Sequence, residues 1–324
     1  MKRKKKEIPV SYGGQAVMEG VMMRGKEHYC VAVRNPAGEI ETRTGQIQHS
    51  KFSTAVGKIP ILRGIVRLGS SMMVGMKVMS ASAEIAGLDE VSEGKKPSKM
   101  SNDAVIILAV VISLAFSVAL FMLLPTWLSS FVPLENERLR GVIEGFVRLA
   151  IFMVYLMSIS LIKDIKRVFQ YHGAEHKVIN CYEAGEELSP DCAKKYGRLH
   201  KRCGTSFLLF VMIISMIFFL FVNTDDVWLR VVSRILFVPF IAGISFEVIR
   251  WAGISKSPIV KILSWPGFML QKITTKEPDE GQMEVAIAAL NGVLVAEGKI
   301  VVEDADEPVG ATQVGQTDIE PAGV

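Results

Sequence analysis

Three of the five histidines in this chain lie in one segment, and two of them are four residues apart. The stretch YHGAEHK, residues 171–177, contains His172, Glu175 and His176. On an α-helix, residues four apart share a face, so the two imidazoles could bind one divalent metal ion. Glu175 borders that face and could accept a proton from metal-activated water. The order His-x-x-Glu-His is the inverted form of a metalloprotease motif and predicts a zinc site with Glu175 as the catalytic base.

Zinc requires more ligands than two histidines, with three protein ligands in catalytic sites and usually four in structural sites. We expect His200 and Cys203 to complete the set, because a turn or helix start there could direct both side chains to one point. Glu183 is a weaker alternative, since it lies about 10 Å beyond His176 along a straight helix. Four bound ligands would make the site closed and structural, whereas absence of Cys203 would leave a position open for water. The alternative without metal is that the histidines are solvated or contact lipid head groups.

The elements that would position these residues are membrane helices. Hydrophobic residues make up 50% of the chain, and the mean hydropathy is +0.33, too apolar for an ordinary soluble protein. A run of roughly 20 apolar residues is needed to cross the hydrocarbon layer. We therefore predict a mainly α-helical membrane protein with about four transmembrane helices, interfacial amphipathic helices and a small N-terminal β-rich cytoplasmic unit. The predicted spans are residues 104–124, 141–162, 206–222 and 229–249.

Two of these spans contain charged residues. Glu144 and Arg148 are one helical turn apart and could form a structural pair. The charges of the last span, Arg230, Arg234 and Glu247, lie near its ends, where side chains can reach the interface. A transporter would be another use for such charges, but neither an internal repeat nor a pair of broken helices accompanies them.

Basic residues lie on one side of the predicted spans. The chain begins MKRKKK, and segment 163–205 is rich in Lys and Arg, whereas the loop 223–229 has no basic residue. Because cytoplasmic loops carry the basic excess, we expect both termini and segment 163–205 in the cytoplasm. No apolar stretch of the signal-peptide type follows the basic start. The net charge is only +4, which together with this placement favours anionic lipid head groups, and not nucleic acid, as partners.

A cytoplasmic location would keep the four cysteines reduced, so no disulfide is expected. Cys181 is interpreted as a small apolar filler and Cys192 as an incidental loop residue.

The polar segments divide the chain further. Residues 58–86 have apolar positions at helical spacing and predict an interfacial helix, with a re-entrant span as the alternative. The turn sequence at 35–38 predicts a β-hairpin. The predicted order is a basic start and β-rich unit (1–50), an interfacial helix and linker (51–102), a transmembrane domain (103–270), an amphipathic helix (271–302) and a disordered acidic tail (303–324).

Three motifs also resemble a known family. GGQAVMEGVMMRG (13–25), YHGAEHK (171–177) and RCGTSFL (202–208) resemble the YqhQ family of bacterial membrane proteins, without departure inside any motif. The resemblance covers about Tyr12 to Leu270. It implies a multi-pass protein of the bacterial cytoplasmic (inner) membrane, from a family whose members are described as predicted metal-dependent enzymes without an established reaction.

Two functions follow from these observations. The first is a zinc-dependent hydrolase, peptidase-like in character, acting at the cytoplasmic membrane surface. In such a site, Glu19 or Arg24 could stabilise developing charge, although an ordinary surface role is the alternative.

The second is a non-enzymatic scaffold or membrane-protein biogenesis factor with a structural metal or none. Flexible thioether side chains adapt to varied protein or peptide clients, although core or lipid packing is the alternative role. The methionines concerned are Met18, Met22, Met23, Met72, Met73, Met76 and Met79. A homo-oligomer is compatible with either function.

Overall fold

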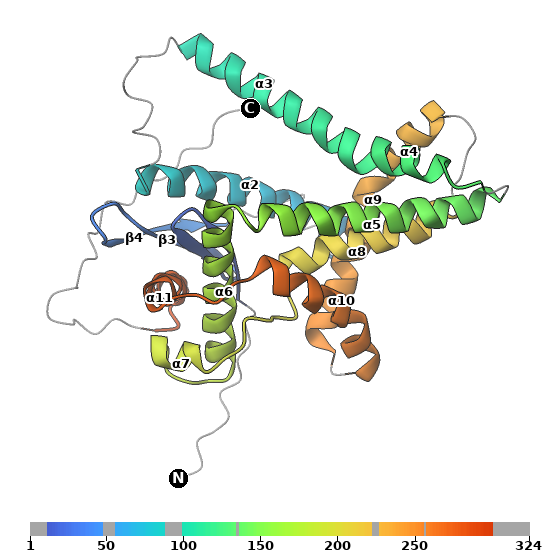
Figure 1. Ribbon diagram of the computed structural model, residues 1–324. Helices are drawn as coiled ribbons and strands as arrows, with labels where there is room; N and C mark the ends of the chain where they lie inside the picture. The colour runs from blue at the N-terminus through green and yellow to red at the C-terminus, as the bar shows by residue number, and fades with distance from the viewer. Residues whose placement is uncertain are drawn as a thin grey trace, which may run out of the picture.

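The computed structural model describes residues 12–47, 56–87, 99–133, 136–221, 227–255 and 257–300. Within these residues the chain is mostly helical, with one small sheet near the N-terminus (Figure 1). The expected basic start, most of the linker after residue 87 and the acidic tail lie outside the described residues.

The sheet has four antiparallel strands in the order β1-β2-β3-β4. The strands are β1 (Gly13–Val17), β2 (Gly20–Arg24), β3 (His28–Arg34) and β4 (Ile40–Gln46). The predicted hairpin is present, as β3 and β4. Its turn is held by the Asn35 side chain, which accepts from the Glu39 backbone N–H at 2.9 Å, and by Gly38 at a φ of 89°. The glycine-rich first motif supplies β1 and β2.

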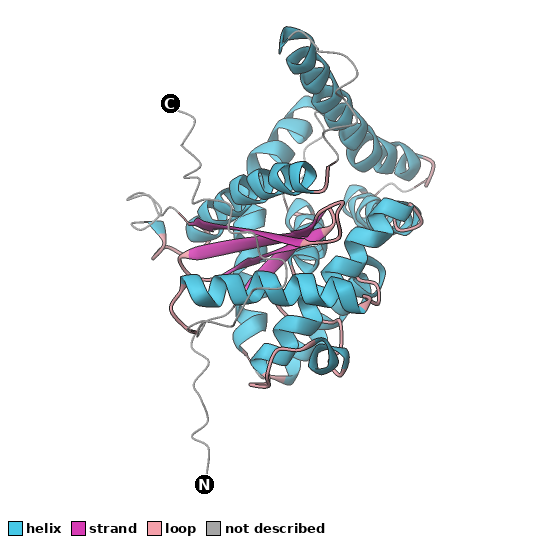
Figure 2. Cartoon of the chain, turned by 90° about the vertical axis from the view of Figure 1, so that its left-hand side faces the viewer, coloured by secondary structure: helices cyan, strands magenta, loops and turns pink. Residues whose placement is uncertain are grey.

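Helices cover both faces of this sheet (Figure 2). Helices α6 (Lys163–Glu183) and α11 (Glu280–Ala296) pack on one face, where Met23 and Ala32 are buried with Leu290. Helix α2 (Leu62–Ile85) covers the other face, where Met22 and Val31 are buried. Because side chains alternate along a strand, β2 and β3 are apolar on both faces, as their position between two helical layers requires.

Three helices are long and apolar enough to cross a membrane: Val110–Ser130, Arg138–Ile159 and Leu236–Gly253. They belong to the continuous helix α3–η2–α4 (Lys99–Val118, Ala119–Leu123, Leu124–Ser130), to α5 (Glu137–Ile159) and to α9 (Val227–Ile254). By their length and composition, these helices support the prediction of a membrane protein. The expected span at 206–222 corresponds to α8 (Gly204–Phe219), which is apolar but shorter, so a count of four spans stays a prediction. Helix α10 (Pro258–Thr274) packs beside α8.

The expected charge pair inside the second span is present. Arg148 Nη2 lies 2.6 Å from Glu144 Oε1, and Arg148 Nε donates to the Phe121 carbonyl at 2.8 Å. Phe121 belongs to η2, a π-helical turn whose wider hydrogen-bonding pattern interrupts the α-helical one. In α9, Glu247 forms a two-point ion pair with Arg63 of α2, with contacts of 2.6 and 2.5 Å. Arg148 thus links α5 to η2, and the Arg63–Glu247 pair links α2 to α9.

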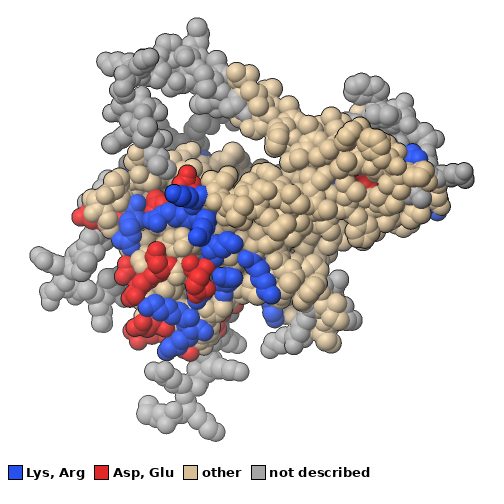
Figure 3. Space-filling model, in the orientation of Figure 1, with Lys and Arg blue, Asp and Glu red and all other residues tan. Residues whose placement is uncertain are grey.

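Charged residues are segregated from the helical bundle. On the face shown in Figure 3, nearly all Lys, Arg, Asp and Glu side chains gather over the region of α6, α7 (Pro190–Lys194) and α11, whereas the bundle of long helices shows few charges. Many large apolar side chains of these long helices are exposed, among them Leu114 and Phe146. The molecule therefore has a sheet unit with a polar surface, joined to helices whose surface suits lipid.

Candidate metal centre

Helix α6 positions both histidines of the inverted motif. Its apolar face packs against the sheet and α11, which buries His176 and leaves His172, one turn earlier, partly exposed. Gly173 permits a close approach at this point, because a Cβ there would collide with the Lys276 carbonyl oxygen in the segment after α10. The Lys276 N–H donates to the Phe169 carbonyl at 2.8 Å, which fixes the segment on α6.

Cys203 reaches the same place from another element. It is the residue before the first turn of α8 and is 4% exposed. The loop that leads to it is tied to α6, because Asn180 Nδ2 donates to the carbonyls of Gly197 at 2.8 Å and Leu199 at 3.2 Å. These bonds hold Cys203 opposite the histidines.

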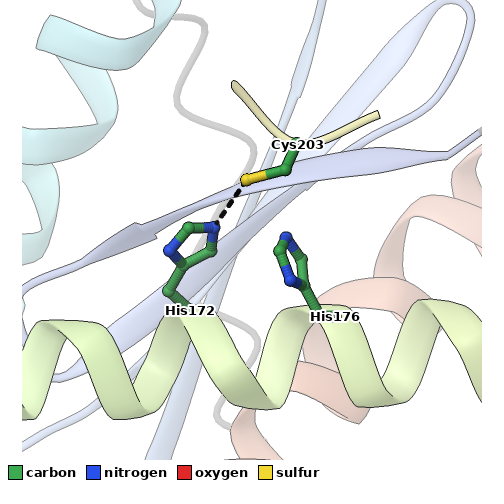
Figure 4. Close-up of side chains that lie close together, drawn as sticks. All are labelled: His172, His176 and Cys203. Carbon is green, nitrogen blue, oxygen red and sulfur yellow. Dashed lines mark hydrogen bonds between the residues drawn. The ribbon is translucent and has the colours of Figure 1, made fainter. Parts of the chain in front are cut away.

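The ligand atoms of His172, His176 and Cys203 all lie within 4.8 Å of one another (Figure 4). His172 Nε2 is 3.2 Å from Cys203 Sγ, and the two imidazole centroids are 4.5 Å apart. Two imidazoles and a thiol at these separations are donors that zinc and other borderline metal ions prefer.

Backbone carbonyls fix the tautomer of both imidazoles. His172 Nδ1 lies 2.9 Å from the Thr274 carbonyl, and His176 Nδ1 lies 2.6 Å from the Arg198 carbonyl. Because a carbonyl can only accept, each Nδ1 donates and each neutral Nε2 keeps a free lone pair. A second hydrogen bond of this kind commonly orients metal-binding histidines.

Burial shifts the pKa values of two residues at the centre of the site, His176 and Glu175. It lowers the pKa of His176, which favours the neutral imidazole that can bind a metal. It also raises the pKa of Glu175, against the opposing influence of His172, His200 and a hydrogen bond from the Gly14 backbone N–H. Glu175 packs against Gly14 of β1 and is not one of the three clustered ligand residues.

His200 has other partners. Its ring centroid is 5.6 Å from that of His176, but its Nε2 faces Glu183 at 3.7 Å. Gln271 fixes its backbone by accepting from the His200 N–H at 2.8 Å and donating to the His200 carbonyl at 2.9 Å. Glu183 also pairs with Arg202 and lies outside the cluster. A role for His200 as a fourth ligand stays a prediction.

The charges of the first motif lie elsewhere. Glu19, in the turn between β1 and β2 with a φ of 51°, accepts from Arg167 Nη2 at 2.5 Å and from the Tyr171 hydroxyl at 3.3 Å. Arg24 Nη1 donates to Ser71 of α2 at 2.8 Å, on the face of the sheet opposite Glu175. The part of the motif that contacts the site is Gly14, whose lack of a side chain leaves room for Glu175. In the sequence, the adjacent glycines Gly13 and Gly14 are the feature that indicates a close approach between β1 and another element.

The expectation of four reduced cysteines was wrong for one pair, since Cys181 and Cys192 form a disulfide. The two are 11 residues apart, and α7 folds back against the end of α6, which brings the second cysteine onto the first. Sequence spacing alone did not reveal this return. Cys30 and Cys203 are free and buried.

Comparison with known proteins agrees with the three motifs. A family model described as "Protein of unknown function (DUF1385)" matches residues 59–296. The "Uncharacterized protein YqhQ" of Bacillus subtilis (strain 168) is 40% identical over 299 residues, covering 90% of this chain and 94% of that protein. The chain belongs to the YqhQ family. Neither description of the YqhQ family assigns a reaction, so the clustered side chains are the guide to function. No solved structure matches.

Proposed function

We propose that this YqhQ-family protein is a zinc-dependent hydrolase of the bacterial cytoplasmic membrane, with its site on the cytoplasmic face. The observation that carries the proposal is the convergence of His172, His176 and Cys203, in which the carbonyl bonds of Nδ1 leave both Nε2 atoms unprotonated and turned toward the thiol. Such a donor set suits zinc, and three protein ligands are the number found in catalytic zinc sites.

Glu175 supplies the proton acceptor in this proposal. A zinc ion held by the three ligands would polarise a carbonyl and lower the pKa of water to about 7. Glu175 precedes His176 directly, and its raised pKa brings the carboxyl closer to neutral pH, where a group can both accept and return a proton. Its bond from the Gly14 N–H keeps the carboxyl oriented from the sheet side.

The location of the cluster supports action at the membrane surface. His172 and His176 come from α6 in the sheet unit, whereas Cys203 begins α8, and Thr274, whose carbonyl holds His172, ends α10. The basic residues around segment 163–205 favour the cytoplasmic side for this junction, whereas the Cys181–Cys192 disulfide in the same segment is of a kind that is rare in the cytoplasm. The proposed topology also requires α8 to cross the membrane, although its 16 residues extend only about 24 Å. A reporter fused within residues 222–226 should lie outside the cytoplasm; a cytoplasmic reporter would exclude this topology.

Metal analysis of the purified full-length protein tests the ligand set. We expect about one zinc per chain in the wild type, and loss of zinc in His172→Ala, His176→Ala and Cys203→Ala. His200→Ala is the matched control, because His200 lies outside the group of three clustered ligand atoms and its Nε2 is 3.7 Å from Glu183. Zinc retained in all three ligand variants would exclude the site, and zinc lost in His200→Ala would make the site four-coordinate and closed.

The catalytic part of the proposal needs a separate test. We expect Glu175→Gln to keep its zinc and yet fail to replace the wild type in cells that lack this protein. Cobalt substitution gives a readout that needs no substrate, since the visible spectrum of an open site changes with pH, and that pH dependence should shift in Glu175→Gln. A spectrum independent of pH, together with full function of Glu175→Gln in cells, would favour a structural metal.

One observation favours the second function, a membrane scaffold or biogenesis factor. Met72, Met73 and Met76 of α2 are 59%, 59% and 63% exposed, so none of them serves the core of the sheet unit. A photo-crosslinking residue at position 73 or 76 should capture a membrane-protein client if this function is correct. Crosslinks to lipid alone would exclude it.

A further inference from the structure

Two arginines lie together where β2 ends beneath α2. Arg24 is partly buried, and its Nη1 donates to Ser71 Oγ at 2.8 Å. Arg67 is one helical turn before Ser71 on α2, and its guanidinium carbon is 6.0 Å from the centroid of Phe246 in α9. The three polar side chains therefore face one region between the sheet unit and a membrane-spanning helix.

Neither arginine forms an ion pair with a carboxylate in the part of the chain that the structure describes. The neighbouring arginines behave differently, since Arg63 of α2 pairs with Glu247 and Arg43 of β4 pairs with Glu84. Burial lowers the pKa of Arg24, and the positive charge of Arg67 lowers it further. Arginine nevertheless stays protonated at neutral pH, so two like charges are held near each other. A bound anion would offset their repulsion.

The structure leaves room for such an anion. Gly13 of the edge strand β1 is paired with Arg24 in the sheet register, and a Cβ at Gly13 would meet no atom within 4 Å. Open space is therefore present beside Arg24 on the α2 side. Guanidinium groups bind phosphate oxygens through paired N–H donors, and a serine hydroxyl can add a third contact.

The position of the pair relative to the membrane helices indicates the source of the phosphate. Phe246 lies in the C-terminal half of the span Leu236–Gly253, about 10 Å along the helix from Gly253. Glu247, beside it in the chain, pairs with Arg63 and Arg250, and such a group of charges on a membrane-spanning helix suits the level of the lipid head groups. Met72 and Met73, directly after Ser71, are each 59% exposed and could contact acyl chains. We propose that Arg24, Arg67 and Ser71 bind the phosphate group of an anionic phospholipid at the cytoplasmic membrane surface.

This lipid site is separate from the metal centre. Arg24 lies on the α2 face of the sheet, whereas Glu175 contacts Gly14 from the α6 face. The proposal does not depend on zinc or on catalysis, and either one can fail alone. A bound lipid here would hold α2 and the sheet unit against the membrane at a fixed level.

Native mass spectrometry of delipidated full-length protein in detergent tests the proposal. We expect phosphatidylglycerol to bind the wild type more tightly than phosphatidylcholine does. Arg24→Gln and Arg67→Gln should each weaken phosphatidylglycerol binding about tenfold or more, because each removes a charged hydrogen-bonding group. Lys77→Gln is the matched control, since Lys77 is an exposed cation further along α2.

Three outcomes would overturn the assignment. Equal phosphatidylglycerol affinity in the wild type, Arg67→Gln and Lys77→Gln would exclude a role for Arg67, whose side chain is exposed and can be replaced without opening a cavity. Equal binding of phosphatidylcholine would exclude recognition of an anionic lipid. Displacement of phosphatidylglycerol by inorganic phosphate at millimolar concentration would identify a soluble phosphate as the ligand. Arg24→Lys keeps the positive charge but loses the paired N–H donors. This variant should bind phosphatidylglycerol more weakly than the wild type and more tightly than Arg24→Gln.

Discussion

The sheet unit and the spanning helices bury apolar residues in different ways. In the sheet unit, Leu290 and Val33 are 0% exposed, because three helices enclose the strands on both faces. In α3, Leu114 is 65% exposed, and only 6% of the most apolar stretch of the span Val110–Ser130 is buried inside the molecule. Figure 1 shows α3 extending away from the other helices. The sheet unit therefore depends on its own core, whereas α3 depends on lipid.

The candidate metal centre lies where these two regions meet, and each region supplies part of it. The sheet unit contributes His172 and His176, and the bundle contributes Cys203 and the carbonyl of Thr274. A site divided in this way should be sensitive to the stability of both regions and to the contact between them. The predictions below test that dependence.

The largest effect is expected from the core of the sheet unit. Leu290→Ala should lower the free energy of unfolding by about 2–5 kcal/mol, because it leaves a cavity among fully buried side chains. The unfolding midpoint of the protein in detergent, followed by the loss of near-ultraviolet circular dichroism, measures this change. A shift within error would show that the sheet unit is not an independent core.

Removal of the metal should have the next largest effect. A ligand present at 100 times its dissociation constant stabilises a folded protein by about 2.7 kcal/mol. A chelator should therefore lower the unfolding midpoint of the wild type and speed proteolysis in residues 184–203, the loop that ends at Cys203. Cys203→Ser, lacking the metal from the start, should not respond to the chelator. An equal response of the wild type and Cys203→Ser would show that the chelator does not act by removing a metal bound to Cys203.

A third prediction concerns the contact between the two regions. Replacing glycine by alanine inside a helix normally stabilises the helix by about 1 kcal/mol. At Gly173, however, the added Cβ would collide with the Lys276 carbonyl oxygen. Gly173→Ala should thus destabilise the protein by about 1–3 kcal/mol and reduce its zinc content. Gly141→Ala in α5 is the matched control, because its Cβ would make only an ordinary contact of 3.8 Å with Leu220. Equal stability of the two variants would contradict the proposed close packing at Gly173.

Much of this organisation could be predicted from the sequence because its signals are local. The length of apolar runs identified the spanning helices, and the turn at residues 35–38 identified the hairpin. The packing of α2 on the sheet was not predicted, since an apolar stripe is equally suited to lipid or to a strand layer. The disulfide between Cys181 and Cys192 also depends on a tertiary contact that no local pattern encodes.

The candidate site was predictable to a similar degree. The spacing of His172 and His176 placed both on one helix face, and Cys203 was a candidate from its residue type and motif. The carbonyls of Thr274 and Arg198, which set the tautomers, could not be predicted because any residue type supplies a carbonyl. The orientation of His200 toward Glu183 depends on the path of the loop.

A fourth prediction uses the buried carboxyl beside the cluster. Because the folded-state pKa of Glu175 is raised above its usual 4.5, the folded protein binds a proton that the unfolded chain releases, and stability falls as pH rises above 4.5. In the metal-free protein, Glu175→Gln should therefore raise the unfolding midpoint at pH 8, and the gain should shrink as the pH approaches 4.5. Urea titrations at several pH values measure it. A gain that grew toward acid pH would contradict the buried, proton-binding state of Glu175.

The smallest effect is expected in α3, and it gives the counterpart to Leu290→Ala. Leu114→Ala shortens a side chain that is 65% exposed, so it opens no cavity, and the change in unfolding free energy should stay within about 0.5 kcal/mol in detergent. In a bilayer the same change should weaken insertion slightly, because alanine is less apolar than leucine. A loss in detergent comparable to that of Leu290→Ala would mean that α3 packs against protein, most simply a second copy of the chain. Crosslinking between single cysteines at position 114 would then detect that contact.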